Sequence, residues 1–326
     1  MRNLDAQIET FALRRHFTIS RGTKTETIVV VATVSGDQAV GRGECGPNAR
    51  YDETPDSVMS DILAMAPALR AGMTRAALQD AMAPGAARNA IDCALWDHEA
   101  KATGTPAWAL AGHAALEPVV TAFTLSADGP DEMSRAAAAN ADRPLLKLKL
   151  TGVDDRARVL AVRSAAPEAR LIVDANEAWD VATYRALVPE LGALGVELIE
   201  QPFPAGDDTP LAALDRPIPV CADEAFRDRT SLPGLRGKYD VVNIKLDKTG
   251  GLTEALATSA AARAAGFGVM VGCMVGTSLG MAPALLAAQG ADFVDLDGPL
   301  LLADDRTPGL MIDGSILALP PSGLWG

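Results

Sequence analysis

The sequence has few of the side chains on which zinc sites and disulfide frameworks depend. Its three histidines, His16, His98 and His113, form no HExxH motif and no close cluster, so a zinc site is not expected. Its four cysteines are scattered without CxxC spacing, and the first fifteen residues lack an apolar signal core. We therefore expect a cytoplasmic protein with reduced thiols.

The sequence also lacks an excess of basic residues and any long apolar run. It has 29 Lys and Arg against 42 Asp and Glu, a net charge of −13, so nucleic acid is not an expected partner. Hydrophobic residues make up 48% of the chain, yet no uninterrupted stretch could span a bilayer, so no membrane partner is expected. The expected partner is a small molecule, and a homo-oligomer is compatible with the sequence.

The first third of the chain predicts an α+β domain over residues 1–113. Apolar residues at 25–34 indicate a strand. Thr54 followed by Pro55 is typical of a helix start, Thr74 is a second candidate cap, and residues 86–102 form a long Ala-rich helix candidate.

From about residue 114 the pattern changes to short apolar runs that alternate with amphipathic helical stretches. The eight runs lie at 119–125, 145–150, 170–175, 196–200, 218–223, 239–246, 267–272 and 292–297. This repetition predicts an α/β barrel of the TIM type over residues 114–307. Residues 308–326 leave the pattern, and we expect them to pack on the N-terminal domain.

A charged residue lies at the end of six of these runs. The six residues recur at near-regular intervals, with one double interval before the last, and they are Lys149, Asp174, Glu200, Asp223, Lys245 and Asp295. The C-terminal ends of barrel strands meet at one rim, where active sites of this architecture lie. The sequence therefore predicts a charged site on that rim.

Three of the six are acids from consecutive units. Asp174, Glu200 and Asp223 would repel one another unless a cation lay among them. Mg²⁺ takes oxygen ligands in octahedral geometry and leaves positions for water or substrate, so we predict a Mg²⁺ site. Each acid taken alone could instead cap the loop that follows its strand.

Two lysines flank these acids. Lys149 and Lys245 should lie on opposite sides of them in a closed barrel. Lys147 shares a strand face with Lys149, and nearby cations lower the pKa of a lysine, so Lys147 is expected as an electrostatic neighbour and a substrate carboxylate ligand. Two such bases suit removal of a proton beside a carboxylate and its return from the opposite face. The alternative for Lys245 is an ion pair with Asp247.

Several motifs resemble those of a known family. KLK at 147–149, VDANEAW at 173–179, IEQPF at 199–203, CADEAF at 221–226 and NIKLDKTGG at 243–251 resemble the muconate lactonizing enzyme subgroup of the enolase superfamily. Within it, GAARNAIDCALWD at 85–97, LDKTGGLTEAL at 246–256, GCMVGTS at 272–278 and DLDGP at 295–299 are similar to the dipeptide epimerases. The similarity extends to near residue 300.

The resemblance implies a fold, a cofactor and a reaction. The implied fold is a modified TIM barrel, (β/α)7β, with an N-terminal α+β capping domain that the C-terminal tail completes. Asp174, Glu200 and Asp223 are implied as Mg²⁺ ligands, and Lys149 and Lys245 as paired acid/base catalysts. The implied reaction is dipeptide epimerisation through an enediolate, with L-Ala-L-Glu and L-Ala-D-Glu as the expected pair and a role in murein peptide metabolism.

The resemblance also implies how the substrate is recognised. Asp295 and Asp297 would receive the ammonium group of the N-terminal alanine, which suits two acids on one strand face. Residues 21–26 resemble a mobile specificity loop in which relatives carry arginine at the position of Lys24. Lys24 keeps the positive charge of that arginine but lacks its planar guanidinium. It is expected to contact the side-chain carboxylate of the substrate glutamate. The alternative is an exposed lysine without a role.

Three further features belong to the same expectation. The loop 46–53 should form a second lid, and Thr124 is an expected substrate contact. The segment around Cys273 could be a Gly-rich phosphate cradle, but the resemblance implies contact with the substrate backbone.

Other functions remain open on the sequence alone. An N-acylamino acid racemase, a cycloisomerase or a dehydratase of the same subgroup would keep the enediolate chemistry, but its substrate would carry no ammonium group for Asp295 and Asp297. A noncatalytic barrel that binds a small molecule is a second class. Schiff-base catalysis by a lysine is a third, although it leaves the three carboxylates without a role.

Overall fold

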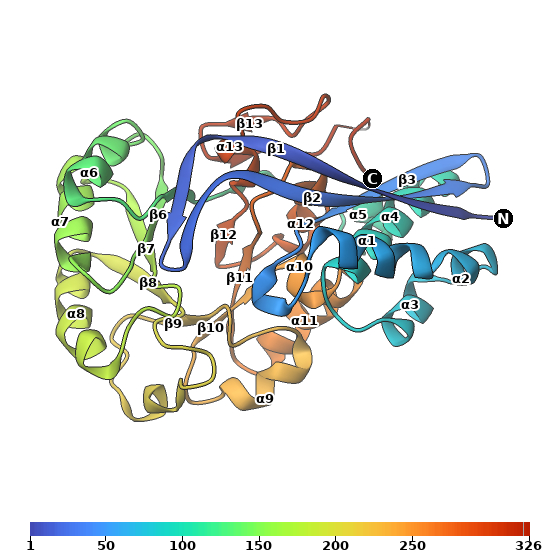
Figure 1. Ribbon diagram of the computed structural model, residues 1–326. Coiled ribbons are helices and arrows are strands. Elements are labelled where there is room, and N and C mark those ends of the chain that lie inside the picture. The colour runs from blue at the N-terminus through green and yellow to red at the C-terminus, as the bar shows by residue number, and fades with distance from the viewer. Residues whose placement is uncertain (322) are drawn as a thin grey trace.

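The computed structural model describes residues 1–321 and 323–326 and contains three sheets. Figure 1 shows a barrel wrapped by helices beside an N-terminal domain of strands and helices. The strands are β1 Asn3–Ile19, β2 Gly22–Gly36, β3 Ala39–Cys45, β4 Val119–Val120, β5 Phe123–Leu125, β6 Leu145–Lys149, β7 Arg170–Asp174, β8 Val196–Glu200, β9 Val220–Ala222, β10 Val241–Ile244, β11 Gly268–Gly272, β12 Phe293–Asp295, β13 Ile312–Asp313 and β14 Ile316–Leu317.

Helices cover the outside of the barrel and one face of the N-terminal sheet. They are α1 Pro55–Ala64, α2 Ala66–Arg70, α3 Arg75–Ala81, α4 Ala86–Thr103, α5 Ala107–Leu110, α6 Pro130–Ala138, α7 Asp155–Ala165, α8 Val181–Ala193, α9 Leu232–Leu235, α10 Leu246–Thr249, α11 Leu252–Ala264, α12 Ser278–Ala287 and α13 Gly298–Leu301, with short 3-10 turns at Ala49–Tyr51, Thr209–Ala213 and Arg229–Ser231. Within the described ranges, no helix is both long enough and apolar enough to cross a membrane.

The central sheet has the order β5-β6-β7-β8-β9-β10-β11-β12, and its paired strands run parallel. A backbone hydrogen bond of 2.8 Å from Ala122 N to Val294 O joins its first and last strands. The predicted α/β barrel with an N-terminal α+β domain is therefore confirmed.

Side chains along β6 point alternately out of and into the barrel, which explains why two lysines occur within an apolar run. Leu146 and Leu148 point outward into the large core beneath the helices. Leu145 points inward, with Ile172, Leu198 and other inner residues that form an apolar layer in the barrel. Because side chains two apart share a face, the two lysines of this strand point into the barrel above that layer.

The N-terminal domain follows its predicted helix starts. Thr54 accepts a hydrogen bond from Ser57 N in a capping box at the start of α1, and Thr74 caps α3 by accepting from Ala77 N. Residues 21–26 differ from the expected loop, because β2 begins at Gly22 and Lys24 pairs with Phe17 of β1. Alternating threonines favour this extended backbone.

The first apolar run also differs from prediction, since it forms two strands rather than one. β4 pairs with β14 of the C-terminal tail, whereas β5 belongs to the barrel. The break falls at Thr121, whose amide bonds to Ser315 O and whose hydroxyl accepts from Leu296 N. The chain thereby leaves the tail sheet and enters the barrel.

The last residues of the C-terminal tail contact the N-terminal domain. The Trp325 indole donates to Cys93 O at 3.0 Å, and Gly326 N donates to the Asp97 carboxylate at 2.7 Å. Both partners lie on α4. The last residues therefore tie this helix to the small tail sheet beside the barrel.

Helix α4 joins the two halves of the molecule. Arg88 donates to the carbonyls of Thr249 and Gly250, and Asp92 accepts from Thr253 N at 2.9 Å. A Cβ built on Gly251 would lie 2.5 Å from Asp92 Cβ, and its φ of 113° also disfavours other residues. The paired glycines of the TGG motif thus allow this close approach.

Candidate active site

The structure brings the predicted charged residues together at one rim of the barrel. Lys149, Asp174, Glu200 and Asp295 are the last residues of β6, β7, β8 and β12, while Asp223 and Lys245 directly follow β9 and β10. All six are buried.

Lys147 lies at the centre of this cluster and is 1% exposed. Its Nζ is 2.6 Å from Glu200 Oε2, 2.7 Å from Asp295 Oδ2 and 3.4 Å from Asp174 Oδ2. Burial alone would lower the pKa of Lys147, but Asp295 and Glu200 raise it well above its usual value. Lys147 is therefore a fixed positive charge that its acids balance.

The two candidate bases contact different acids. Lys149 Nζ lies 2.6 Å from Asp174 Oδ2, and Lys245 Nζ lies 2.7 Å from Asp223 Oδ2. The alternative ion pair of Lys245 with Asp247 is wrong, because Asp247 is bonded to Gly46 and Asn89 instead. Strands β7, β8 and β9 separate β6 from β10, which sets the two lysines across the rim from each other.

A third lysine completes the setting of Asp223. Lys248 donates to Asp223 Oδ1 at 2.6 Å and to its carbonyl oxygen at 2.7 Å. Burial alone would raise the pKa of Asp223, but Lys245 and Lys248 hold it well below its usual value. Asp223 is therefore ionised and held through both carboxylate oxygens.

Glu200 keeps an oxygen free of any hydrogen-bond donor. Asn243 donates to Glu200 Oε1 at 2.8 Å. Lys147 is close to Oε2, but the contact lacks hydrogen-bond geometry, so this buried oxygen has no donor among the described residues. Burial and Asp174 raise the pKa of Glu200 to about 7. A carboxylate in this state is suited to ligating a cation.

The acids available to such a cation are Asp174, Glu200 and Asp223, in that strand order, with Asp174 paired in register with Glu200. As the described side chains stand, no three acidic, histidine or cysteine groups are arranged to hold a metal ion. Lysine ammonium groups contact Asp174 and Asp223.

Asp295 and Asp297 lie close to Thr124 of β5. Thr124 N donates to Asp297 Oδ2 at 2.6 Å, and its hydroxyl is 3.4 Å from Asp295 Oδ1. Burial and Asp295 raise the pKa of Asp297 to about 7. Cys273, in the loop after β11, is partly buried, and burial together with Asp295 raises the pKa of its thiol well above the usual value.

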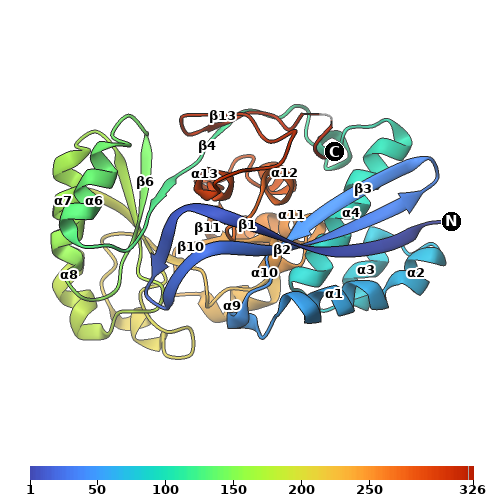
Figure 2. The same ribbon diagram turned by 45° about the horizontal axis from the view of Figure 1, so that its top comes forward.

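The β1–β2 hairpin crosses from the N-terminal domain to the barrel rim (Figure 2). At its tip, Arg21 contacts Glu224 at 2.7 Å and Glu177 at 3.2 Å. Arg50, from the predicted second lid, contacts Glu177 at 2.9 Å. Lys24 is exposed on β2 and forms no ion pair in the described part of the chain. The hairpin tip and the loop 46–53 thus both contact Glu177 of the barrel.

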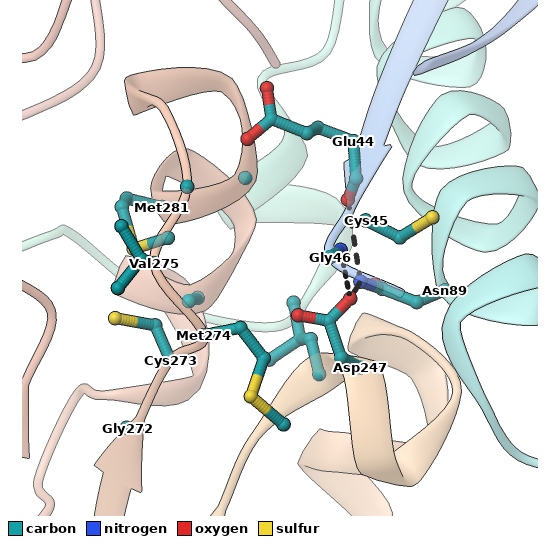
Figure 3. A pocket seen from close by; sticks show the side chains of 14 residues that line it. Glu44, Cys45, Gly46, Asn89, Asp247, Gly272, Cys273, Met274, Val275 and Met281 are labelled. Carbon is teal, nitrogen blue, oxygen red and sulfur yellow. Dashed lines mark hydrogen bonds between the residues drawn. The ribbon is translucent and has the colours of Figure 1, made fainter. Parts of the chain in front are cut away.

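A small pocket lies beside the charged cluster, between the two halves of the molecule (Figure 3). It is lined by the end of β3, by helices α4 and α10 and by the loop after β11. Its walls include Glu44, Gly46, Asn89, Asp247, Cys273 and Met274.

Sequence reasoning missed several polar residues of the site. They are Arg21, Glu177, Glu224, Asn243 and Lys248. Asn243 could have been found, because it lies two residues before Lys245 on the inward face of β10. Lys248 lies in the four-residue helix α10 and Glu177 lies in a turn, and neither segment is long enough for periodicity to indicate the direction of a side chain.

Comparison with known proteins gives a consistent answer. Residues 5–112 match the mandelate racemase/muconate lactonizing enzyme N-terminal domain, and residues 132–318 match the enolase C-terminal domain-like family. The L-Ala-D/L-Glu epimerase of Escherichia coli is 45% identical over 95% of this chain and 97% of its own. An N-acetyl-D-glutamate racemase from a Pseudoalteromonas species is 43% identical over 91% of this chain and 95% of its own.

One solved structure is similar over the whole chain. It is an enolase family member from Agrobacterium tumefaciens with homology to dipeptide epimerases, with bound sodium and L-Ala-L-Glu. It is 53% identical, covers 100% of both chains and has a TM-score of 0.99. The chain described here therefore belongs to the mandelate racemase/muconate lactonizing enzyme family of the enolase superfamily, and it is an isomerase.

Proposed function

We propose that this protein epimerises dipeptides of the L-Ala-Glu type at the α-carbon of the C-terminal residue, by a two-base proton transfer through an enediolate. The observation that carries the proposal is the placement of Lys149 and Lys245 on opposite sides of Asp174, Glu200 and Asp223 at one rim. Names of the relatives support the same substrate class.

In this proposal Asp174, Glu200 and Asp223 hold Mg²⁺, which would supply Lewis-acid stabilisation of the negative charge on the substrate carboxylate. The donor-free Oε2 of Glu200 supports this assignment. Lys147, fixed among its acids, supplies a permanent positive charge for the same carboxylate.

The two bases exchange roles with the direction of the reaction. In its neutral form Lys149 removes the α-proton from one face, and the Lys245 ammonium returns a proton to the opposite face. The reverse reaction uses Lys245 as the base and Lys149 as the acid. Each lysine contacts a different acid, Asp174 for Lys149 and Asp223 for Lys245.

Asp295 and Asp297 are proposed to bind the substrate ammonium group. Only Asp295 contacts a lysine, and Thr124 N alone donates to the Asp297 carboxylate among the described residues. The positive charge of a substrate ammonium group would compensate the negative charge of Asp297, which no lysine in the described ranges contacts. The second candidate function is racemisation of an N-acylated amino acid. The similarity to the N-acetyl-D-glutamate racemase favours it. In either function, Thr124 and Cys273 would contact the substrate.

Acetylation of the substrate separates the two functions. L-Ala-L-Glu should be a good substrate and N-acetyl-L-Ala-L-Glu a poor one, because the acetylated form leaves two carboxylates facing an uncharged, bulkier group. Replacing both Asp295 and Asp297 with asparagine should weaken the free dipeptide much more than the acetylated one. Measurement of kcat/KM for both substrates decides. Equal values in the unmodified enzyme, or turnover of N-acetylglutamate alone, would support the racemase instead.

Lys24 is proposed to meet the side-chain carboxylate of the substrate. It lies three residues beyond Arg21, which holds the hairpin tip at the rim. Lys24→Ala should therefore raise KM more for L-Ala-L-Glu than for the neutral L-Ala-L-Met, because only the former loses a charged partner. If KM rises by the same factor for both dipeptides, Lys24 does not bind the side-chain carboxylate.

We also propose the limits 1–113 for the capping domain, 114–307 for the barrel and 308–326 for the tail. The contacts of the tail with α4 support the last limit. A cytoplasmic location is proposed from the four cysteines, which are all unpaired.

A further inference from the structure

Asp247 occupies an unusual place in the molecule. It lies in α10, two residues after Lys245, yet its bonds lead to the N-terminal domain. Its Oδ1 accepts from Gly46 N at 3.0 Å and from Asn89 Nδ2 at 2.8 Å (Figure 3). Gly46 opens the lid loop 46–53, and Asn89 lies on α4. One carboxylate therefore connects the turn beyond Lys245 to both a lid and a helix of the other domain.

The surroundings of Asp247 offer it no counter-ion. It forms no ion pair among the described residues, and burial raises its pKa to about 7. The acids nearest to it are engaged elsewhere: Glu44 contacts Arg306 at 2.7 Å, and Glu53 accepts from Asn48 N and Ala86 N. Asp247 is half-buried, and a carboxylate withdrawn from water without a cation is costly to the fold, so stability alone does not account for it.

The turn that carries Asp247 is short, and Arg88 of α4 also donates to the carbonyls at its end, those of Thr249 and Gly250. Lys245 is the N-cap of α10, a helix of four residues, and its carbonyl accepts from Lys248 N and Thr249 N at 2.9 Å. A shift of this turn would therefore move Lys245 with it.

The other base is supported differently. After Lys149, the loop at Thr151 and Gly152 is held by Asp155, whose carboxylate accepts from both amides and from the Trp179 indole. All of these residues belong to the barrel. Of the two turns that follow the candidate bases, the one after Lys245 is linked across the interface by a carboxylate, whereas the carboxylate that holds the turn after Lys149 belongs to the barrel.

We propose that Asp247 is a positioning residue for Lys245, and that it fixes this base, rather than Lys149, through the start of the lid loop and α4. The inference rests on the proposed two-base function. It implies that loss of the link impairs proton transfer at one face of the α-carbon more than at the other.

The test compares the two epimers separately. Asp247→Ala, loaded with Mg²⁺, is incubated in D₂O with L-Ala-L-Glu or L-Ala-D-Glu, and loss of the α-proton signal is followed by NMR. The epimer served by Lys245 is the one that Lys245→Ala no longer exchanges. Asp247→Ala should slow exchange of that epimer about 10- to 100-fold more than exchange of the other, in kcat rather than KM. Asp247→Asn, which keeps the acceptor oxygen, should restore most of the rate.

Asp92→Ala is the matched control, because Asp92 is a buried acid of the same interface whose bonds go to Thr253 instead. It should slow both epimers alike or not at all. Equal slowing by Asp247→Ala, or the same asymmetry in Asp92→Ala, would overturn the inference. Should Asp247→Ala fail to fold, Asn89→Ala removes one of the two donors and should show a smaller asymmetry of the same sign.

The proposed function fails on different grounds from this inference. If Lys149→Ala and Lys245→Ala do not select opposite epimers, the two-base function is wrong. If they do and Asp247→Ala shows no asymmetry, only the role of Asp247 is wrong.

Discussion

Replacing either Lys149 or Lys245 with alanine should lower the epimerisation rate by about 10²- to 10⁴-fold, the usual contribution of a positioned acid or base. Each lysine contacts its own acid, Asp174 or Asp223, and three strands separate the strands that carry them. Neither lysine can therefore reach the face of the α-carbon that the other serves. Loss of either should stop epimerisation in both directions.

Proton exchange distinguishes this result from general damage to the site. In D₂O each variant should still exchange the α-proton of one epimer without converting it, and the two variants should retain opposite epimers. Lys248→Ala would not give this pattern, since the Lys248 ammonium donates to the carboxylate and the carbonyl oxygen of Asp223. If one lysine can be removed with little loss of epimerisation, or if both variants retain the same epimer, the two-base mechanism is wrong.

Removal of divalent metal should abolish turnover, and addition of Mg²⁺ should restore it. A Lewis acid contributes several kcal/mol at about 1.36 kcal/mol per factor of ten, so we expect a loss of about 10³-fold or more. Lys147 cannot replace the metal, because its charge is already shared among Asp174, Glu200 and Asp295.

Metal binding can be measured without turnover. Calorimetric titration of Mg²⁺ into metal-free enzyme should show a site that Glu200→Gln weakens strongly, because Glu200 supplies a donor-free oxygen. Glu197→Gln, at an acid near the start of the same strand, should leave binding unchanged, since Glu197 contacts Arg170, the first residue of β7, at the end of the barrel away from the rim. Full activity of a metal-stripped sample would contradict the assignment.

The barrel and its rim were predictable because strand geometry alone determines both. Once the apolar runs are recognised as strands, residues such as Asp174 and Glu200 must lie at their C-terminal ends. Strand alternation likewise places Lys147 and Lys149 on the inward face. These predictions depend on local periodicity and need no knowledge of which elements touch.

The remaining features of the site depend on contacts between distant segments. Lys147 is an example, since the sequence presented it as a bare cation beside Lys149, whereas its charge is balanced by acids from three other strands. Arg21 meets Glu177, which is 156 residues away along the chain, and Glu224, which is farther still. No periodicity of either segment indicates such a contact.

The central claim is that this site moves a proton between the two faces of the α-carbon of a dipeptide. It is tested most directly by incubating the Mg²⁺-loaded enzyme with L-Ala-L-Glu in D₂O and following both epimers by NMR. The account predicts that L-Ala-D-Glu appears with deuterium at the glutamate α-carbon, and that L-Ala-D-Glu as the starting material gives deuterated L-Ala-L-Glu. Retention of the α-proton in both dipeptides, with the metal bound, would contradict it.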